Sequence, residues 1–499
     1  MKNMKKILAL GLALVMSLSI VACGGNGAQE TGGSANTPSG DSTPGTSTPS
    51  ASGDAKQDGR IDIGTWWDRY FDSSNQSVEE DPAYSGDNRA HLMLAKVREV
   101  EAKYNLKVFY NNLTYEGNME SVNTSILAGS PDMDIYQVNL ADFGIAAAMN
   151  GLAVDLRTVL PADHDIFTDQ KYVKFLDLGD GKATLFTAVS AELDVADSYP
   201  LAYNKQLLEA NNLEDPNALW DRGEWTWDKF AEYLQILTQD TDGDGQIDQY
   251  GYAGYVAETS AELFMSNGAV IAGGDHEGLS SQAAGEALQF MYDIYNTWKV
   301  APPYDYEYFG NGGGSPHNTM RKDAYRQGNI GFFPISCWIA AESDYNWNGL
   351  SESPLNFDTV WCRWPVGPSG NKDTNPGKLL SGGSMYMIPA GVAEPELVFN
   401  VWFDMYNWYD GDVELRDDRE NLFWWFVATA YEEPLQNHNF SIMVDCGATA
   451  VFDLWRGFGN DIEGFNLGME SIIGGEMTPA QFQESFKNPM QDALNALFN

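Results

Sequence analysis

The loop at residues 240–248 carries side chains that suit the binding of a metal ion. Asp240, Asp242 and Asp244 alternate along it, and Gly245 occupies the sixth position, as in the first half of a calcium-binding loop. This alternation lets a tight turn aim the three carboxylates at one point, and hard cations prefer such oxygen ligands. The sequence therefore predicts a Ca²⁺ site whose ligands are Asp240, Asp242, Asp244, Gln246 through its carbonyl oxygen, and Asp248.

The end of this loop departs from the complete calcium-binding pattern. Gly251 stands at the twelfth position, where a bidentate glutamate is expected. We therefore predict a truncated version of the loop, in which the ion would have a structural and not a catalytic role. A solvated acidic turn without a metal is the alternative interpretation.

Aromatic and carboxylate side chains also occur together where the first strand is expected to end. The sequence there is Trp66-Trp67-Asp68, and the chain contains 15 tryptophans in all. A tryptophan ring stacks on the C–H face of a pyranose, while aspartate accepts hydrogen bonds from the hydroxyl groups at its rim. Because neighbouring residues of a strand point in opposite directions, only one of Trp66 and Trp67 is expected to face a ligand. Trp338 is the second aromatic candidate, and packing in the core is the alternative for each ring.

The remaining ligand-binding candidates are polar residues and glycines, namely Asn139, Asp142, Glu258, Gly382 and Gly383. Asn139 and Asp142 follow the expected third strand, but both could instead cap the next helix. Glu258 could bond a sugar hydroxyl or serve only as a negative charge at the start of a helix. Gly382 and Gly383 could simply relieve crowding in a turn.

Motifs of catalysis are absent from the sequence. It contains no Gly-x-Ser-x-Gly elbow, no His-Glu-x-x-His and no phosphate-binding glycine loop, and its 5 histidines have no metal-ligand spacing. Glycoside hydrolysis needs two carboxylates across a cleft, but so acidic a chain always offers such a pair. We therefore expect a binding protein and not an enzyme.

Alternating strands and helices are predicted around the first tryptophans. Residues 60–65 and 107–110 are expected to be strands, and residues 88–104 and 119–127 helices, before a third strand near residue 135. This order is typical of a parallel sheet wound by helices, whose ligands bind at the carboxyl ends of the strands.

Further along the chain, the apolar spacing predicts a half-buried helix at residues 227–237, which Thr226 would cap. Residues 257–272 and 281–298 are also expected to be helices. The closing helix begins with a capping box, in which Thr478 caps and Gln481 completes the box.

Length and charge restrict the class of protein. At 499 residues the chain exceeds what one core usually covers, so two lobes are expected. The formal net charge of −42 repels nucleic acid and anionic lipid, which excludes nucleic acid as a partner and suits an exported protein.

The amino-terminal residues predict export and lipidation. Three lysines precede the apolar run 7–21, as in a secretory signal, and Ile20-Val21-Ala22-Cys23-Gly24 resembles the lipobox in which Cys23 is lipidated. A plain signal peptide is the alternative. Residues 24–58 consist almost wholly of small and polar residues and are expected to form a flexible tether. No later stretch is apolar enough to span a membrane, so lipid chains would be the only anchor.

Three cysteines, Cys337, Cys362 and Cys446, remain after this leader. An odd number cannot all pair internally, and we expect buried free thiols.

Several segments together resemble a known family. The segment from Tyr199, Tyr-Pro-Leu-Ala-Tyr-Asn-Lys-Gln-Leu-Leu, followed by Trp225-Thr-Trp, is similar to the crossing between lobes in the maltose-binding-like solute-binding proteins of ABC importers. Further resemblance lies in 327–338, which ends in Trp338, in the return crossing 361–370 and in the strand-like 381–389.

This resemblance implies the fold class and the function. The expected fold is α/β and two-lobed, like that of periplasmic binding proteins, with each lobe a wound, mainly parallel sheet flanked by helices and joined by crossover strands. The expected domains are a signal peptide at 1–22, the lipidated tether at 23–59, lobe 1 at 60–198 and 369–420, and lobe 2 at 199–368 and 421–499.

The expected function is that of a receptor, a monomer that closes on a carbohydrate, most simply an oligosaccharide, and delivers it to the permease subunits of an ABC importer. It would be lipid-anchored to the outer face of the bacterial cytoplasmic membrane. A secreted polysaccharide-active enzyme and a surface adhesion protein are the alternatives. Within the binding class, a peptide or a polyamine is an alternative ligand.

Overall fold

The computed structural model describes residues 59–69, 71–80, 88–189, 199–273, 275–303, 325–335, 355–373, 384–418, 438–439, 441–443, 445–446, 453–458 and 462–498. All of them belong to the compact unit Asp54–Asn499. Cys23, Trp338, Gly382 and Gly383 lie outside the described residues. Within the described part, no helix has both the length and the apolar character needed to cross a membrane.

A six-stranded sheet holds the first candidate residues. Its strand order is β2-β1-β3-β10-β5-β4, and β1 is parallel to both β2 and β3. The later strands run antiparallel, beginning with β10 against β3. The strands are β1 (Arg60–Thr65), β2 (Lys107–Asn112), β3 (Ile135–Asn139), β4 (Val173–Phe175), β5 (Phe186–Ala188) and β10 (Ser384–Met387).

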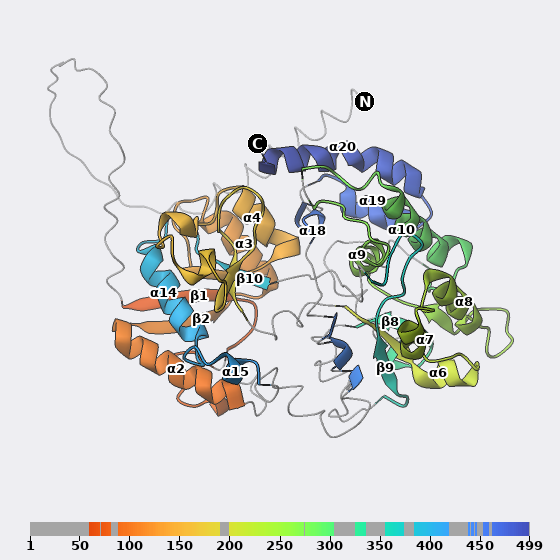
Figure 1. Cartoon of the computed structure of the whole chain (residues 1–499), viewed down its shortest axis with the longest axis horizontal. Coiled ribbons are helices and arrows are strands. Elements are labelled where there is room, and N and C mark those ends of the chain that lie inside the picture. The colour runs from red at the N-terminus through yellow and green to blue at the C-terminus, as the bar shows by residue number, and fades with distance from the viewer. Residues whose placement is uncertain are drawn as a thin grey trace, which may run out of the picture. The chain divides into compact units, whose positions relative to one another are not determined.

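Helices cover both faces of this sheet because side chains alternate along its strands. Ile135 on β3 joins an apolar cluster that includes residues of α2 and α14, whereas Tyr136 joins another that includes residues of α3 and α4. Figure 1 shows α2 and α14 close together beside β1 and β2. The helices are α2 (Asn88–Tyr104), α3 (Tyr115–Ser125), α4 (Ile145–Met149) and α14 (Pro395–Tyr406).

The second sheet has four strands in the order β7-β8-β6-β9. β7 is parallel to β8, while β6 is antiparallel to both β8 and β9. Every residue of β6, β8 and β9 is buried, which explains their nearly continuous apolar sequences. The strands are β6 (Leu201–Asn204), β7 (Tyr250–Tyr252), β8 (Ile330–Pro334) and β9 (Thr359–Cys362).

Helices associated with the second sheet follow their local signals. Thr226 caps α8, because its side chain accepts a hydrogen bond from the Lys229 amide at 3.4 Å. Thr478 and Gln481 form the predicted capping box at the start of α20. The helices are α6 (Lys205–Ala210), α7 (Pro216–Arg222), α8 (Trp227–Leu237), α9 (Val256–Ser266), α10 (Gln282–Tyr292), α18 (Trp455–Phe458), α19 (Phe465–Ile473) and α20 (Pro479–Phe498).

Short helical turns complete the described part. They are η1 (Val78–Glu80), η2 (Leu140–Gly144), η3 (Leu156–Thr158), η4 (Asp165–Phe167), η5 (Asp293–Thr297) and α15 (Val413–Arg416). Two of them, η2 and η5, are single π-helical turns.

The expected two-lobed α/β fold is confirmed, with one difference. Both sheets are mixed and not mainly parallel, because β10 and β6 run against their neighbours. The predicted helix 88–104 has the expected bounds. The helix expected at 119–127 begins earlier, at Tyr115, because the Thr114 hydroxyl oxygen accepts a hydrogen bond from the Gly117 amide.

The cysteines that the structure describes agree with the sequence. Cys362 and Cys446 are free and buried, as expected. Burial raises the pKa of Cys446 to about 12 and that of Cys362 well above its ordinary value. Both thiols are therefore poor nucleophiles at neutral pH.

Candidate functional site

The carboxyl ends of β1, β2 and β3 bring most of the predicted first-lobe residues to one edge. Parallel pairing sets Thr65 opposite Asn112, so the chain leaves β1 and β2 on the same side of the sheet. Trp66, Trp67 and Asp68 follow directly, and Asn139 is the last residue of β3. This edge is where wound sheets bind ligands.

The two adjacent tryptophans have different surroundings. Trp66 is half-buried and packs edge-on against Tyr115 and Phe143, at ring-centroid distances of 5.5 and 6.5 Å. Trp67 is 36% exposed and meets Trp66 at 4.8 Å with an interplanar angle of 80°. Trp67 is therefore the ring with exposed surface at this edge, and Trp66 packs against it.

Asp68 is held in place by hydrogen bonds across the strand ends. Asn112 donates through its side-chain amide to the Asp68 carboxylate at 3.2 Å. The Thr65 hydroxyl donates to the carbonyl of Trp67 at 2.9 Å, which fixes the turn between them. Asp68 stays exposed and keeps acceptor capacity for a ligand hydroxyl.

Arg69, which follows Asp68, was not among the predicted residues. Its guanidinium carbon lies 4.1 Å from the centroid of the Trp67 ring, within the range of a cation–π interaction. The same group donates from Nη2 to the side-chain oxygen of Gln137 on β3 at 2.6 Å. Arg69 thus ties the exposed tryptophan to the middle of the sheet.

Asn139 and Asp142 have separate roles in the turn after β3. The Asn139 side chain accepts a hydrogen bond from the Asp142 amide at 3.1 Å, so it acts as the cap that was its alternative role. The Asp142 carboxylate accepts a hydrogen bond from the Tyr115 hydroxyl. Asp142 therefore links η2 to the aromatic cluster around Trp66.

Thr114, next to Tyr115, has a strained backbone. Its φ of 63° and ψ of 167° fall in a region that β-branched residues rarely adopt. Such strain costs about 1–3 kcal/mol and persists only where its surroundings impose it. The strained residue Thr114 directly precedes Tyr115, whose side chain contacts Trp66 and Asp142.

Glu258 belongs to an ion pair that the sequence did not reveal. Arg456 of α18 lies 3.2 Å from the Glu258 carboxylate, and the two side chains are only 11% and 18% exposed. Burial alone would lower the pKa of Arg456, but the carboxylates of Glu258 and Asp142 raise it above its ordinary value. The guanidinium thus lies within the electrostatic influence of candidates from both lobes.

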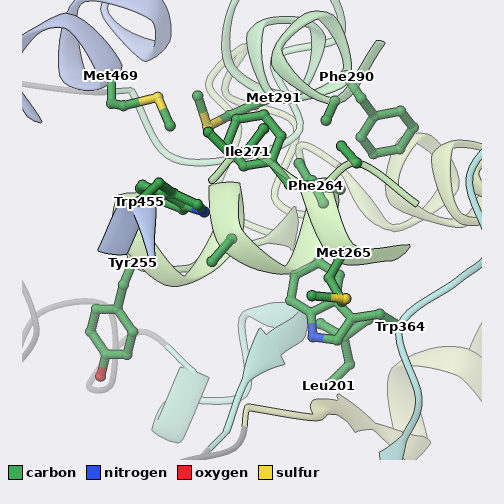
Figure 2. Close-up of a cluster of buried hydrophobic side chains, with 14 of the residues drawn as sticks. Leu201, Tyr255, Phe264, Met265, Ile271, Phe290, Met291, Trp364, Trp455 and Met469 are labelled. Atoms are coloured by element: carbon green, nitrogen blue, oxygen red, sulfur yellow. The ribbon is translucent and has the colours of Figure 1, made fainter. Parts of the chain in front are cut away.

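Close packing holds α18 at this position. A Cβ atom on Gly457 would lie 2.6 Å from the Cβ of Ile145 in α4, which is closer than side chains allow. On the other side, Trp455 packs against Phe264 and Phe465 at centroid distances of 5.7 and 5.8 Å. Figure 2 shows Trp455 within this buried cluster. The position of Arg456 is therefore fixed by contacts with both α4 and the helices of the second sheet.

The acidic loop gathers three of its predicted ligands. Carboxylate oxygens of Asp240, Asp242 and Asp244 all lie within 4.8 Å of one another. The amides of Gly243 and Gly245 donate to Asp240 at 2.7 and 2.8 Å, which curls the loop around this group.

Asp248 and Gln246 have other contacts in this loop. The Asp248 carboxylate accepts hydrogen bonds from the hydroxyl and the amide of Thr241, and these bonds lower its pKa. It stands apart from the group of three carboxylates. Gln246 is exposed, and its amide donates to Asp244 at 2.8 Å. The clustered carboxylate oxygens of Asp240, Asp242 and Asp244 are the type of ligand that a hard divalent cation prefers.

A cavity of about 250 Å³ lies at the opposite end of β1. Its lining includes Gly59, Arg60 and Tyr104, and the Arg60 guanidinium is engaged by Asp62 at 2.6 Å. Since it opens near the amino end of the strand, it is separate from the edge that carries Trp67.

Comparison with known proteins identifies the family. Residues 93–402 match the family model described as bacterial extracellular solute-binding protein. The chain belongs to this family. A comparison with curated protein sequences gave no match.

Solved structures share the fold of this solute-binding protein at low sequence identity. A maltose/maltodextrin-binding domain from Bdellovibrio bacteriovorus bound to maltotriose has 16% identity and a TM-score of 0.53, with 87% of this chain and 100% of that chain covered. An ABC substrate-binding protein from Listeria monocytogenes in complex with cycloalternan has 16% identity, a TM-score of 0.57 and coverage of 87% and 99%. The GacH receptor of Streptomyces glaucescens, solved unliganded and with acarbose, has 16% identity, a TM-score of 0.54 and coverage of 89% and 99%.

Family membership agrees with two expectations from the sequence. The resemblance to solute-binding proteins of ABC importers is confirmed. Members of this family are binding proteins, in line with the expectation that the chain is not an enzyme.

Three residues that contact the candidate residues, Arg69, Tyr115 and Arg456, were not predicted from the sequence. Arg69 directly follows a chosen motif and could have been included with it. Tyr115 begins a helix after Thr114, a signal that was available but not used. Arg456 carries no local signal, since only the packing of α18 brings it to Glu258.

We predict that Arg456→Met destabilises this solute-binding protein by about 3 kcal/mol, because it leaves the Glu258 carboxylate largely buried without its cation. Urea denaturation followed by circular dichroism measures the free energy of unfolding.

The matched control is Arg363→Met. Arg363 pairs with Asp445 at 3.0 Å, but the Asp445 side chain is 59% exposed, so we expect a loss of about 1 kcal/mol or less. Equal losses in the two variants would contradict a special role for the Arg456–Glu258 pair.

Proposed function

We propose that this solute-binding protein binds a carbohydrate, most simply an oligosaccharide, and delivers it to the permease subunits of an ABC importer. The observation that carries the proposal is the exposed Trp67 beside Asp68 and Asn112 at the carboxyl edge of β1 and β2. Structural neighbours in complex with maltotriose and cycloalternan support a sugar as ligand.

Each part of this edge suits one part of a sugar. The Trp67 ring offers an apolar plane for the C–H face of a pyranose. The Asp68 carboxylate can accept from hydroxyl groups, and the neighbouring Asn112 amide can both donate and accept. Because Asn112 already orients Asp68 at 3.2 Å, little conformational freedom is lost on binding.

Delivery would depend on closure of the two lobes around the sugar. A ligand that contacts both lobes binds the closed form more tightly than the open form. This difference in affinity shifts the equilibrium toward the closed form. Arg456 supports this proposal, because it pairs with Glu258 and is influenced by Asp142. The protein would act as a monomer. The edge of β1 would contact the sugar from one lobe, and α9, which carries Glu258, would contact it from the other.

The alternatives have less support. A polysaccharide-active enzyme would be an exception in a family of binding proteins. A surface adhesion protein would not require a ligand-induced closure, so solution scattering with and without sugar separates it from a receptor. A thermal-shift screen would reveal a peptide or polyamine ligand, because such a ligand would raise the melting temperature and sugars would not.

Calcium binding by the loop at 240–248 is a second part of the proposal. Asp240, Asp242 and Asp244 would hold the ion through their clustered carboxylates, and the ion would supply only charge neutralisation and rigidity. Repulsion among the three carboxylates would be relieved by the cation, which would stabilise the folded state by mass action.

Lipid anchoring through Cys23 is the third part. The support is the sequence alone, in which a lysine-led apolar run ends at the lipobox-like Val21-Ala22-Cys23. Anchored in this way at the outer face of the cytoplasmic membrane, the receptor would stay near its permease.

We expect Trp67→Ala to weaken sugar binding about 30-fold, because it removes the stacking plane. This corresponds to about 2 kcal/mol, the scale of a buried aromatic contact at an interface. Isothermal titration with an oligosaccharide found by a thermal-shift screen measures the dissociation constant. Trp67→Phe should keep it within about 3-fold.

Trp298→Ala is the control, since Trp298 is half-buried and packs on Phe290 of α10, among the helices associated with the second sheet. Its dissociation constant should match that of the unchanged protein. A Trp67→Ala variant with unchanged affinity, or a screen in which no sugar binds, would refute the proposed function.

Calcium at about 2 mM, a concentration above the dissociation constants of about 10⁻⁴–10⁻³ M of extracellular calcium modules, is expected to raise the melting temperature by about 2 °C. The double variant Asp240→Asn, Asp244→Asn should lose this rise, because it removes two of the three clustered carboxylates. Asp221→Asn, an exposed change outside the loop, should keep it. An equal rise in all three proteins would mean that calcium acts elsewhere.

Replacement of Cys23 by serine is expected to abolish incorporation of labelled palmitate and release the protein from the membrane fraction. Cys446→Ala is the control, because it removes a buried thiol and leaves the leader intact. If Cys23→Ser stays membrane-bound and labelled, the lipid anchor lies at another residue.

A further inference from the structure

Arg69 is surrounded mainly by aromatic rings. Its guanidinium carbon lies 4.1 Å from the Trp67 ring centroid and 5.9 Å from those of Phe71 and Tyr110. Its Nη2 donates to the Gln137 side chain at 2.6 Å. These contacts hold a positive charge at the carboxyl edge of β1 and β3, next to the exposed tryptophan.

This arginine forms no ion pair with any carboxylate of the described residues. Arg157 of the described part shares this lack of an acidic partner, although the chain's 71 acidic residues far outnumber its 29 basic ones. Other arginines of the described part do have acidic partners, among them Arg60, Arg98, Arg222, Arg363, Arg416 and Arg456.

The carboxylates closest to Arg69 in sequence have other hydrogen-bond partners. Asp68 accepts from the Asn112 side chain at 3.2 Å. Asp72, which is buried, accepts from the amides of Ser74 and Tyr110. Neither of them forms an ion pair with the guanidinium, so the charge has no directly paired carboxylate among the described residues.

The hydrogen-bonding groups of Arg69 are also incompletely used. Nε is buried and has no acceptor among the described residues, and Nη1 has no protein acceptor there but is not enclosed. The faces of aromatic rings attract the guanidinium charge. The N–H groups of a guanidinium, however, point outward within the plane of the guanidinium itself. The rings therefore explain how the charge is tolerated, but leave the N–H group of Nη1 without a partner.

We propose that Arg69 determines specificity and that the ligand is an acidic carbohydrate. This inference rests on the proposed function, because it assigns the chemical class of the sugar that would bind beside Trp67. One sugar unit would stack on the exposed part of Trp67, and a carboxylate or sulfate of a neighbouring unit would accept hydrogen bonds from Nη1 of Arg69. Both anions offer the oxygens that guanidinium groups bind most strongly.

The net charge of −42 does not oppose this binding at physiological salt. Repulsion from the remote surface is screened beyond about 8 Å at 0.15 M ionic strength, whereas a direct contact with Arg69 is not. Selection of an acidic sugar would therefore depend on local contacts at the edge of β1.

Titration of the full mature chain against a panel of oligosaccharides tests the inference. The panel contains uronate oligosaccharides, sulfated oligosaccharides and neutral counterparts of the same linkage and length, all at 0.15 M salt. We expect at least one acidic member to bind ten-fold or more tightly than its neutral counterpart. The uronate and sulfate arms identify which anion is preferred, and inorganic sulfate alone should compete only at millimolar concentrations.

Variants of Arg69 then test whether this residue causes the preference for acidic over neutral oligosaccharides. Arg69→Gln should weaken the acidic ligand ten-fold or more and leave the neutral counterpart within about 3-fold. Arg69→Lys keeps the charge but not the planar donor group, and it should retain part of the preference even if the glutamine variant folds poorly. The control is Arg157→Gln, because Arg157 also lies over two aromatic rings, Phe167 and Phe175, but far along the sheet near β4.

The outcomes separate this inference from the proposed function. If only neutral sugars bind, or if they bind as tightly as their acidic counterparts, the inference is wrong while the proposed function stands. An acidic preference that survives in Arg69→Gln also overturns the role of Arg69. If no carbohydrate of either kind binds, both the proposed function and the inference fail.

Discussion

Parallel pairing of β1 with β2 and β3 is the constraint on which the candidate site depends. Three strands that run in the same direction must end at the same edge, and each turn back into a helix begins there. Trp66, Trp67, Asp68 and Asn139 therefore lie at the same edge of the sheet, although the chain between β1 and β3 spans about seventy residues. If one of these strands ran the other way, its polar residues would lie at the amino end of the sheet, near the cavity beside Arg60.

Positive charge in the site is scarce and closely controlled. In a chain with 29 basic and 71 acidic residues, two arginines of the described part, Arg69 and Arg456, lie near candidate residues, and their surroundings differ. Arg456 forms an ion pair with Glu258 and is attracted by the Asp142 carboxylate, so it links α18 to α9 and η2. Arg69 is stabilised by aromatic faces and keeps its charge unmatched by the described carboxylates. The same residue type thus forms an ion pair in one place, while in the other it lies over aromatic rings, where we propose that it recognises a ligand.

Local signals in the sequence predicted the elements more successfully than the contacts between them. Helix α2 and the caps Thr226 and Thr478 could be predicted because apolar spacing and capping chemistry involve neighbouring residues only. The mixed direction of the sheets could not, because the strands that run against their neighbours pair with residues far away in sequence. Likewise, Asp68 could be named as a candidate from its own motif, whereas the placement of Arg456 depends on the close contact of Gly457 with Ile145, which no local pattern encodes. Asp248 was assigned by spacing alone, and its bonds to Thr241 could not be foreseen from spacing.

The exposure of Trp67 gives the protein an optical property of its own. Among the tryptophans that the structure describes, it alone is exposed, and a guanidinium lies over its ring. Indole fluorescence depends on the polarity and charge around the ring, so the emission of this residue differs from that of the buried majority. A molecule that covers the ring or draws the cation away is expected to change the emission colour of Trp67, whereas the tryptophans described as buried should not contact that molecule. The unlabelled protein therefore carries a spectroscopic reporter at the edge that holds Trp66, Trp67 and Asp68.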